Sequence, residues 1–277
     1  MMTAGRNINV PVRALLLVLI IVAGEVVRAL VSGSALPRLT DAGPIAMYAM
    51  LHAAVLGWVA ARSVWPRVRL FGAIFLALYG VQAVLPYAEL LYLGAALPFS
   101  LDGFASILVP AFPASALASG AAVLLFAGVN PGSDSVSAER SANVASWVWR
   151  VSAAGSVYAV LYFLAGMLIV HVHDYAREFY AGVGAEINPL TLFLFQIARG
   201  AVWALMAMPL LASQTTSTWE RSNALGAAFA VFVGALLFAE NPHLPAQMRM
   251  LHLIETSVSN FLFGLTAGYL LTRLIRR

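Results

Sequence analysis

The chain of 277 residues contains no cysteine, and each of its 16 basic residues is an arginine, so lysine is absent as well. Without cysteine the protein cannot form disulfides, thiolate metal sites or cysteine-ligated iron–sulfur clusters. Without lysine it cannot form a Schiff base, such as the one that holds retinal, and it lacks the lysine of nucleotide-binding loops. Any chemistry must therefore rely on histidine, carboxylate, arginine, hydroxyl and aromatic side chains.

Charge is also scarce, since only 10% of the residues are charged whereas 61% are hydrophobic. A soluble chain of this length needs far more polar surface, so the composition predicts an integral membrane protein that lies in a lipid bilayer. The formal net charge is +4, but the arginines are scattered and the chain contains no nucleic-acid motif, so we expect no nucleic-acid partner.

Long apolar runs, separated by breaks rich in Pro, Gly and Ser, predict an all-α protein of about eight transmembrane helices. Gly264 and Gly268, four residues apart in the last run, indicate close packing of that helix against a neighbour. The expected spans cover residues 13–33, 43–64, 70–94, 103–128, 145–172, 189–212, 223–240 and 250–272.

The arginines predict the orientation, because cytoplasmic loops of membrane proteins are enriched in basic residues. With both termini in the cytoplasm of a bacterial inner membrane, the inner ends and loops hold 11 of the 16 arginines. Nine of the 12 acids and all five histidines then fall in the outer, periplasmic half. The positive-inside rule does not explain this second asymmetry, so we expect the functional groups in the outer half. The 11 inner arginines are Arg6, Arg13, Arg62, Arg67, Arg69, Arg140, Arg150, Arg221, Arg273, Arg276 and Arg277.

Two short motifs suggest that a four-span unit is used twice, with residues 1–132 as the first repeat and 133–277 as the second. Glu25-x-x-Arg28 matches Asp174-x-x-Arg177 at an offset of 149 residues (174 − 25), and Glu89 in "PYAEL" matches Glu240 in "LFAEN" at 151 (240 − 89). Four spans are an even number, so both repeats would point the same way across the membrane. Chance similarity between apolar helices is the alternative explanation.

Several ionisable residues lie inside expected spans, where a charge is costly and usually turns inward to a partner. Glu25 and Arg28 are one helical turn apart and can pair, either as a structural ion pair or as part of a site. Asp174 and Arg177 lie nearer the surface, where a structural role is favoured. His171 and His173 diverge on a helix, so at most one of them faces the interior.

Arg199 is the most informative basic residue, because it lies ten residues after Pro189 and therefore about 15 Å along a helix. Gln196 precedes it by one turn on the same face. An inward arginine at this depth needs a carboxylate or an anionic ligand, and Glu25 and Glu255 are the expected partners. Snorkelling toward the surface is the alternative.

The last span carries a polar stripe, because His252, Glu255 and Ser259 follow the spacing i, i+3 and i+7, with Asn260 beside them. In a structural interpretation, Glu255 holds the imidazole or pairs with Arg199, and the other two bond neighbouring helices. In a functional interpretation, His252 ligates a metal or haem iron and Glu255 orients it or carries protons. His52 stands alone in an apolar span, where a histidine is usually a core residue with satisfied hydrogen bonds, but it enters from the same side at a similar depth, so the two histidines could converge.

Two segments carry a resemblance to a known family. "LHAAVLGWVAAR" (51–62) and "HLIETSVSNFLFGLTAGYLL" (252–271) resemble the ligand helices of haem–copper-oxidase-like proteins and of the NnrS family of membrane haem and copper proteins linked to nitric oxide stress. The resemblance implies that His52 and His252 are axial ligands of haem b, or ligands of copper together with Glu255.

The expected function is therefore a polytopic inner-membrane protein whose periplasm-facing His/Glu/Arg site binds haem or a metal for a redox or stress-related role. The alternative is a secondary transporter or permease for a small molecule or ion that uses the same cluster. A membrane enzyme with His252 and Glu255 as acid and base is a third hypothesis, although no recognised catalytic motif supports it. Each would involve a small-molecule or redox partner on the periplasmic side.

Overall fold

A computed structural model describes residues 9–93, 107–128, 143–183, 188–238 and 244–275. Within these ranges the chain is 89% helical, and the described part contains no β-strand. The first half consists of α1 (Val10–Ser32), the short 3-10 turn η1 (Leu39–Asp41), α2 (Ala42–Ala61), α3 (Arg67–Tyr79), the π-helical turn η2 (Gly80–Val84), α4 (Leu85–Leu93) and α5 (Val109–Phe126). The second half consists of α6 (Val144–Val172), α7 (Asp174–Val183), α8 (Pro189–Ala212), α9 (Thr218–Gly234), the 3-10 turn η4 (Ala235–Phe238) and α10 (Ala246–Ile275).

Seven helices of the described part are long and apolar enough to cross a membrane, and they fit a polytopic membrane protein. They coincide with the first seven expected spans to within a few residues; one of them runs from Arg67 to Leu93 through α3, η2 and α4. The eighth expected span forms α10, a 30-residue helix whose polar stripe lowers its hydropathy, and it is not among the seven.

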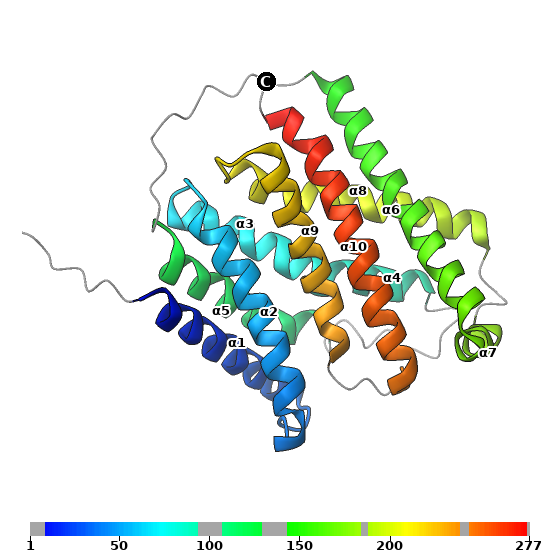
Figure 1. Cartoon of the computed structure of the whole chain (residues 1–277), viewed down its shortest axis with the longest axis horizontal. Helices are drawn as coiled ribbons and strands as arrows, with labels where there is room; N and C mark the ends of the chain where they lie inside the picture. Colours follow the sequence, from blue (N-terminus) through cyan, green and yellow to red (C-terminus); the bar gives the residue numbers. More distant parts are fainter. Residues whose placement is uncertain (1–8, 94–106, 129–142, 184–187, 239–243, 276–277) are drawn as a thin grey trace, which may run out of the picture.

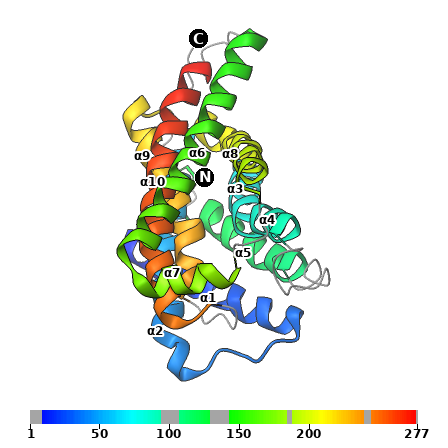
Figure 2. The same ribbon diagram turned by 90° about the vertical axis from the view of Figure 1, so that its right-hand side faces the viewer.

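The helices form two layers, which Figures 1 and 2 show from two directions. In one layer α2, α9, α10 and α6 follow one another, each in contact with the next. In the other layer the neighbours are α8, α3, α5 and α1, in that order. Each layer therefore combines three helices of one half with the second long helix of the other half. Contacts of α2 with α1 and α5, and of α8 with α6 and α10, join the layers.

Glycine allows the closest approach within a layer, between α9 and α10. A Cβ atom on Gly264 would lie 2.6 Å from the carbonyl oxygen of Leu225 and 2.8 Å from Cα of Gly226. A Cβ on Gly268 would lie 2.7 Å from Cα of Ser222. The two glycines in the sequence therefore do mark a tight helix contact, as in other membrane helix pairs.

The turns after α2 and α8 meet each other. Ser63 and Gln214 form an isolated antiparallel bridge, and they are 151 residues apart (214 − 63). The Val64 amide donates to the Ser213 carbonyl at 3.0 Å, and the Gln214 side-chain amide donates to the Val59 carbonyl at 3.0 Å. These buried contacts join the two halves at one end of the bundle.

Burial repeats along the chain in a way that follows the two layers. Most buried positions of α2 and α3 have buried counterparts 151 residues later in α8 and α9, and most of those of α5 have buried counterparts 145 residues later in α10. Examples are His52 with Trp203, Leu56 with Ala207, Ile74 with Leu225, Ala77 with Ala228, Ala118 with Phe263 and Ala122 with Ala267.

In each half, an arginine near the start of the first long helix donates a hydrogen bond to a backbone carbonyl near the end of the fourth. Arg13 on α1 donates to the carbonyl of Leu125 on α5 at 3.0 Å, and Arg150 on α6 donates to the carbonyl of Leu270 on α10 at 2.9 Å. One of the two sequence motifs does not follow this correspondence. Glu25 lies within α1, whereas Asp174 begins the separate helix α7, so the two motifs occupy different places.

Candidate functional site

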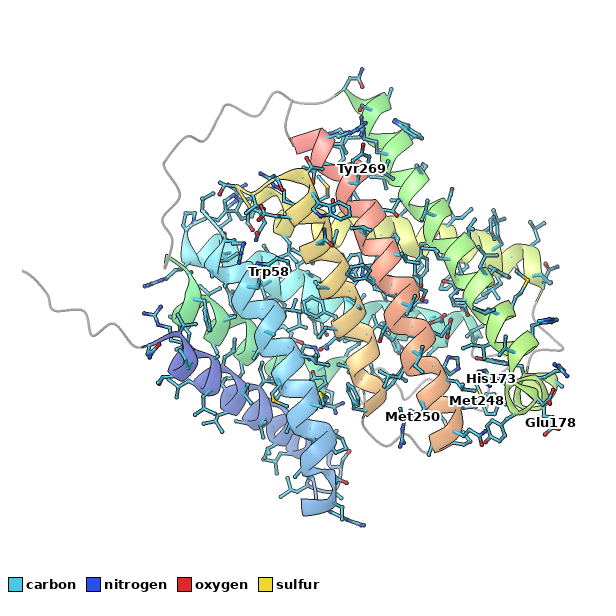
Figure 3. All side chains as sticks on the ribbon, viewed as in Figure 1. Trp58, His173, Glu178, Met248, Met250 and Tyr269 are labelled. Atoms are coloured by element: carbon cyan, nitrogen blue, oxygen red, sulfur yellow. The ribbon has the colours of Figure 1, made fainter. Side chains whose placement is uncertain are left out.

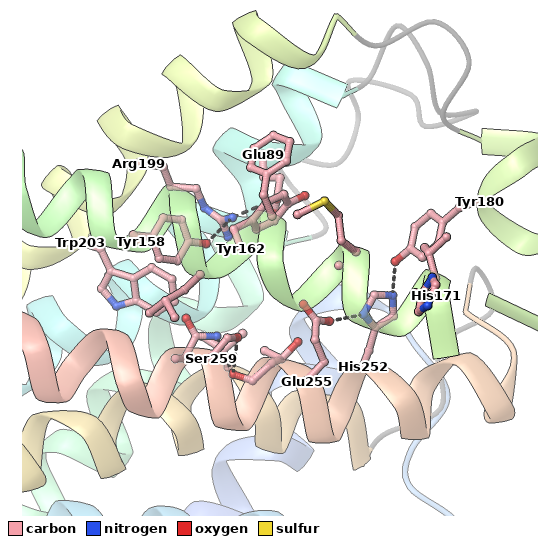
Figure 4. Close-up of a pocket in the computed structure, with 18 of the residues that line it drawn as sticks. Glu89, Tyr158, Tyr162, His171, Tyr180, Arg199, Trp203, His252, Glu255 and Ser259 are labelled. Carbon is pink, nitrogen blue, oxygen red and sulfur yellow. Dashed lines mark hydrogen bonds and ion pairs between the residues drawn. The ribbon is translucent and has the colours of Figure 1, made fainter. Parts of the chain in front are cut away.

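A cavity of about 810 Å³ lies where α6, α8 and α10 of the second half approach α4 of the first half (Figure 4). Aromatic side chains form part of its wall, with Tyr158 and Tyr162 on α6, Trp203 on α8 and Tyr180 on α7. Its ionisable residues are Glu89, His171, Arg177, Arg199, His252 and Glu255. Figure 3 shows the side chains on the ribbon, with His173, Glu178 and Met248 at the end of the bundle where α7 lies.

A buried ion pair crosses the cavity wall between the two halves. The Nη1 atom of Arg199 on α8 lies 2.9 Å from Oε1 of Glu89 on α4. Arg199 is only 8% exposed. Gln196, one turn before it, is fully buried and donates to the same Glu89 oxygen at 3.1 Å. The sequence placed Arg199 inside the bundle correctly, but its partner is Glu89 rather than the expected Glu25 or Glu255.

The remaining contacts of Arg199 concentrate on one edge of its guanidinium. Nη1 also donates to the Tyr158 hydroxyl at 2.8 Å and to Oε1 of Gln196 at 3.4 Å. Its Cζ atom lies 5.6 Å from the Tyr158 ring centre and 5.8 Å from that of Trp203, within cation–π range. Nε is buried without a hydrogen-bond partner among the described residues. A buried N–H without a partner costs free energy, so this edge is suited to an acceptor from outside the chain.

The opposite wall carries a chain of three side chains. Nδ1 of His252 lies 2.9 Å from Oε2 of Glu255, and Nε2 lies 2.7 Å from the Tyr180 hydroxyl. Burial, together with the nearby carboxylates Glu255 and Glu89, raises the pKa of the Tyr180 phenol, so its hydroxyl stays protonated and can donate to Nε2. The His252 ring then donates from Nδ1 to the Glu255 carboxylate.

Tyr180 lies on α7, which the sequence analysis did not predict. This helix lies across the end of α6 (Figures 1 and 2). Its side chains Tyr175, Ala176 and Phe179 pack with Ile169 and Met248, whereas Asp174 and Glu178 are exposed and Arg177 lines the cavity. Its apolar stretch is too short for a span, so a search for long apolar runs could not find it.

Ser259 and Asn260 extend the polar stripe of α10 along the cavity. Their side chains donate to the Thr256 carbonyl of their own helix, at 3.4 Å from Ser259 and 2.8 Å from Asn260. Within the described ranges, neither side chain makes the bond to a neighbouring helix that the structural interpretation assigned to it.

His52 does not line this cavity. It is 1% exposed in the core, where its ring stacks on Phe232 and both ring nitrogens are engaged. Nδ1 lies 2.9 Å from the Tyr48 carbonyl oxygen, and Nε2 lies 2.7 Å from the side-chain nitrogen of Gln82 in the π-helical turn. The structure therefore does not bring His52 together with Arg199, His252 and Glu255 in one cavity.

The other expected polar residues are distributed around the bundle. Glu25 and Arg28 form an ion pair at 2.7 Å on α1, and Asp174 and Arg177 form one at 2.9 Å on α7. His171 lines the cavity, whereas His173 is exposed at the end of α6. Glu240 lies outside the described residues.

Sequence reasoning missed the aromatic residues of the wall, namely Tyr158, Tyr162, Tyr180 and Trp203. Aromatic residues are common at span ends and in helix contacts, so nothing in their spacing distinguished these four. Only the order of the helices in the two layers reveals that they face one cavity.

Across the residues that the structure describes, there is no group of three or more His, Asp or Glu side chains that could hold a metal ion. No protein-family model, curated protein or solved structure matches this sequence.

Proposed function

We propose that this chain is a secondary permease of the bacterial inner membrane, which carries a small molecule through the cavity between its two halves. The observation that carries the proposal is the Arg199–Glu89 ion pair, because it joins α8 of the second half to α4 of the first across the cavity wall. An ion pair of this kind can break and re-form when the two halves move, and transporters hold substrate at such an interface.

The proposal includes an eight-span chain with both termini in the cytoplasm. α10 has 30 residues, enough to cross the bilayer, and it packs along α9 and α6. Its His252, Glu255 and Asn260 line the cavity, which accounts for its lower hydropathy. The cavity then opens toward the periplasmic side, where the acids and histidines of the sequence gather.

The proposal also includes a duplicated four-helix unit whose second helices are exchanged. The symmetric order of the two layers supports it, as do the recurring burial pattern, the Ser63–Gln214 bridge and the matching Arg13 and Arg150 bonds. Parallel repeats related by an axis along the membrane normal occur in several transporter families.

The absence of cysteine allows a test that does not require the substrate to be known. Ser259 lines the cavity from α10, so a Ser259→Cys variant reports access to it. In a permease, a membrane-impermeant maleimide should label this cysteine in right-side-out and in inside-out vesicles, since the cavity opens to each side in turn. A Val258→Cys variant, on an exposed position of the same helix outside the cavity, serves as the control. Labelling of Ser259→Cys from one side only would rule out alternating access.

A second candidate function is the haem binding that the family resemblance implies. His252 favours it, because the Glu255 carboxylate at Nδ1 orients the ring as carboxylates orient metal-bound imidazoles. Nε2 would bind the iron in place of the Tyr180 hydroxyl, and the haem would supply redox or gas-binding chemistry. Protein purified from haem-replete cells should then show a Soret band that His252→Ala removes and His52→Gln retains. A colourless preparation would reject this candidate.

A further inference from the structure

We propose that the cavity takes up a small organic monocarboxylate together with one proton, with the carboxylate on the free edge of Arg199 and the proton on Glu89. This inference rests on the permease function proposed above and names its substrate class and its coupling ion.

The geometry of Arg199 supports an anionic ligand. Its Nη1 atom already contacts Glu89, Tyr158 and Gln196. Among the described residues, neither Nε nor Nη2 has a hydrogen-bond partner. Nε and Nη2 form the edge of a guanidinium that binds a carboxylate with two parallel hydrogen bonds. The free edge therefore matches a carboxylate in both charge and spacing.

The wall around Arg199 supports an apolar body on that ligand. Trp203 and Tyr158 contact the guanidinium, and Tyr162, Phe163 and Met167 continue the lining along α6. Apolar and aromatic walls with a few polar groups are typical of pockets for small organic molecules. A bare inorganic anion would leave most of this wall without a contact.

Charge balance requires the proton. Arg199 and Glu89 together are neutral, so a second carboxylate on the same guanidinium would leave a net negative charge in a buried site, which is costly. Two carboxylates that share one partner hold a proton between them more readily than either does alone. With one proton on Glu89 and the ligand ionised, the site is neutral again, and one anion and one proton have entered.

The Tyr180–His252–Glu255 chain supplies a route for that proton. The Tyr180 hydroxyl passes its proton to Nε2 of His252 as its oxygen takes one from a hydronium ion in the surrounding solution, so the phenol stays neutral, while Nδ1 releases its proton to Glu255. Glu255 points from α10 into the cavity that Arg199 and Glu89 face from the other side (Figure 4), and it passes the proton on to Glu89. The other titratable or charged groups around this route are Tyr158, Tyr162, His171, Arg177 and Arg199.

Benzoate is the probe for the experiment, and benzamide is its uncharged counterpart. Calorimetric titration of the full chain in two buffers with different ionisation enthalpies gives both the affinity and the number of protons taken up. We expect benzoate to bind near pH 7 with uptake of about one proton, and benzamide to bind at least about tenfold more weakly. Arg199→Gln should weaken the binding of benzoate by about 10- to 100-fold, because a charge-assisted pair of hydrogen bonds is lost.

Two further variants separate the proton acceptor from the route. Glu89→Gln should still bind benzoate but take up no proton, since its neutral amide imitates the protonated acid. His252→Gln should still take up about one proton, but the rate of proton uptake should fall by about tenfold or more. This rate is measured with a pH indicator after rapid mixing. Arg28→Gln, which breaks the exposed ion pair on α1, should change neither quantity.

Three results would overturn the inference. They are benzoate binding without proton uptake, benzamide binding as tightly as benzoate, and no binding of either probe at millimolar concentration. None of these results would decide the permease proposal, because the labelling of Ser259→Cys tests that proposal without any ligand.

Discussion

Two arginine–carboxylate pairs in this chain have the same chemistry but differ in burial. The Arg199 and Glu89 side chains are 7% and 21% exposed, whereas those of Arg28 and Glu25 are 45% and 11% exposed, so the two pairs differ in the burial of the arginine. Removing one partner of a buried pair leaves an unpaired charge away from water, while an exposed charge regains its hydration. The two pairs should therefore respond very differently to the same substitution.

We expect Arg199→Gln to lower the free energy of unfolding in detergent by about 3–5 kcal/mol, and Arg28→Gln by less than about 1 kcal/mol. The double variant Arg199→Gln/Glu89→Gln should lose less than the sum of its two single variants, because neither charge is left alone. Chemical denaturation of the four proteins measures these differences. Equal losses for the Arg199 and Arg28 variants would contradict the buried pair.

The sequence identified some of the polar residues that lie inside the bundle, such as Gln196 and Arg199, but not which of them meet. Arg199 was expected to be buried because of its depth in a span, and it is. Its partner could not be foreseen, because Glu89 lies 110 residues away (199 − 89) and pairing depends on the packing of α4 beside α8. His52 and His252 illustrate the same limit, since similar depths do not place two residues on the same cavity.

At the scale of single helices, apolar length predicted most of the fold. The first seven expected spans correspond to seven helices of suitable length, because a helix needs about 20 apolar residues to cross a bilayer. What apolar length cannot predict is a short amphipathic helix such as α7 or a local change of helix type such as η2. Both matter to the interpretation, because α7 carries Tyr180 and η2 carries the Gln82 that holds His52.

The contact between α9 and α10 should be sensitive to a single methyl group. An alanine at 264 would place its Cβ against backbone atoms of Leu225 and Gly226, which cannot rotate away, so the helices must separate. We expect Gly264→Ala to destabilise the protein by about 1–3 kcal/mol, the usual cost of overpacking. The measurement is the thermal transition in detergent.

Gly72 on α3 provides the matched control, because a Cβ there would meet nothing within 4 Å. Gly72→Ala should be neutral or slightly stabilising, since alanine favours a helix more than glycine does. If both substitutions were neutral, α9 and α10 would have to be farther apart than in the structure.

At the scale of the whole molecule, the exchange of α2 and α8 between the layers determines where a site can form. Because each half contributes one helix to the layer of the other, the cavity draws Glu89 from the first half and Arg199, His252 and Glu255 from the second. Tyr48 and His52 of the first half lie 151 residues before Arg199 and Trp203, and Gln82 bonds to both. If the two halves are repeats, as proposed above, equivalent positions carry different functional groups.

The contact between the two turns gives a direct test of this arrangement. Opposed residues of an antiparallel bridge have Cα atoms about 4.5–5.5 Å apart, which is within the range that a disulfide can span. In the cysteine-free chain, Ser63→Cys combined with Gln214→Cys should therefore form a disulfide with a mild oxidant. A protease site inserted between Phe126 and Val144 allows the cross-link to be seen on a gel, because the cleaved halves stay together until they are reduced.

The control pairs Ser63→Cys with Ser156→Cys, which lies on an exposed face of α6 and should not cross-link. Retention of the two halves in the first pair but not in the second would establish that equivalent turns of the two repeats meet, as they would around a two-fold axis. Separation of the oxidised halves, with both cysteines still reactive toward a maleimide, would mean that these turns lie apart. The proposed axis that relates the two layers would then be wrong. The contact of α4 with α8, which forms the ion pair between Arg199 and Glu89, would need a different explanation.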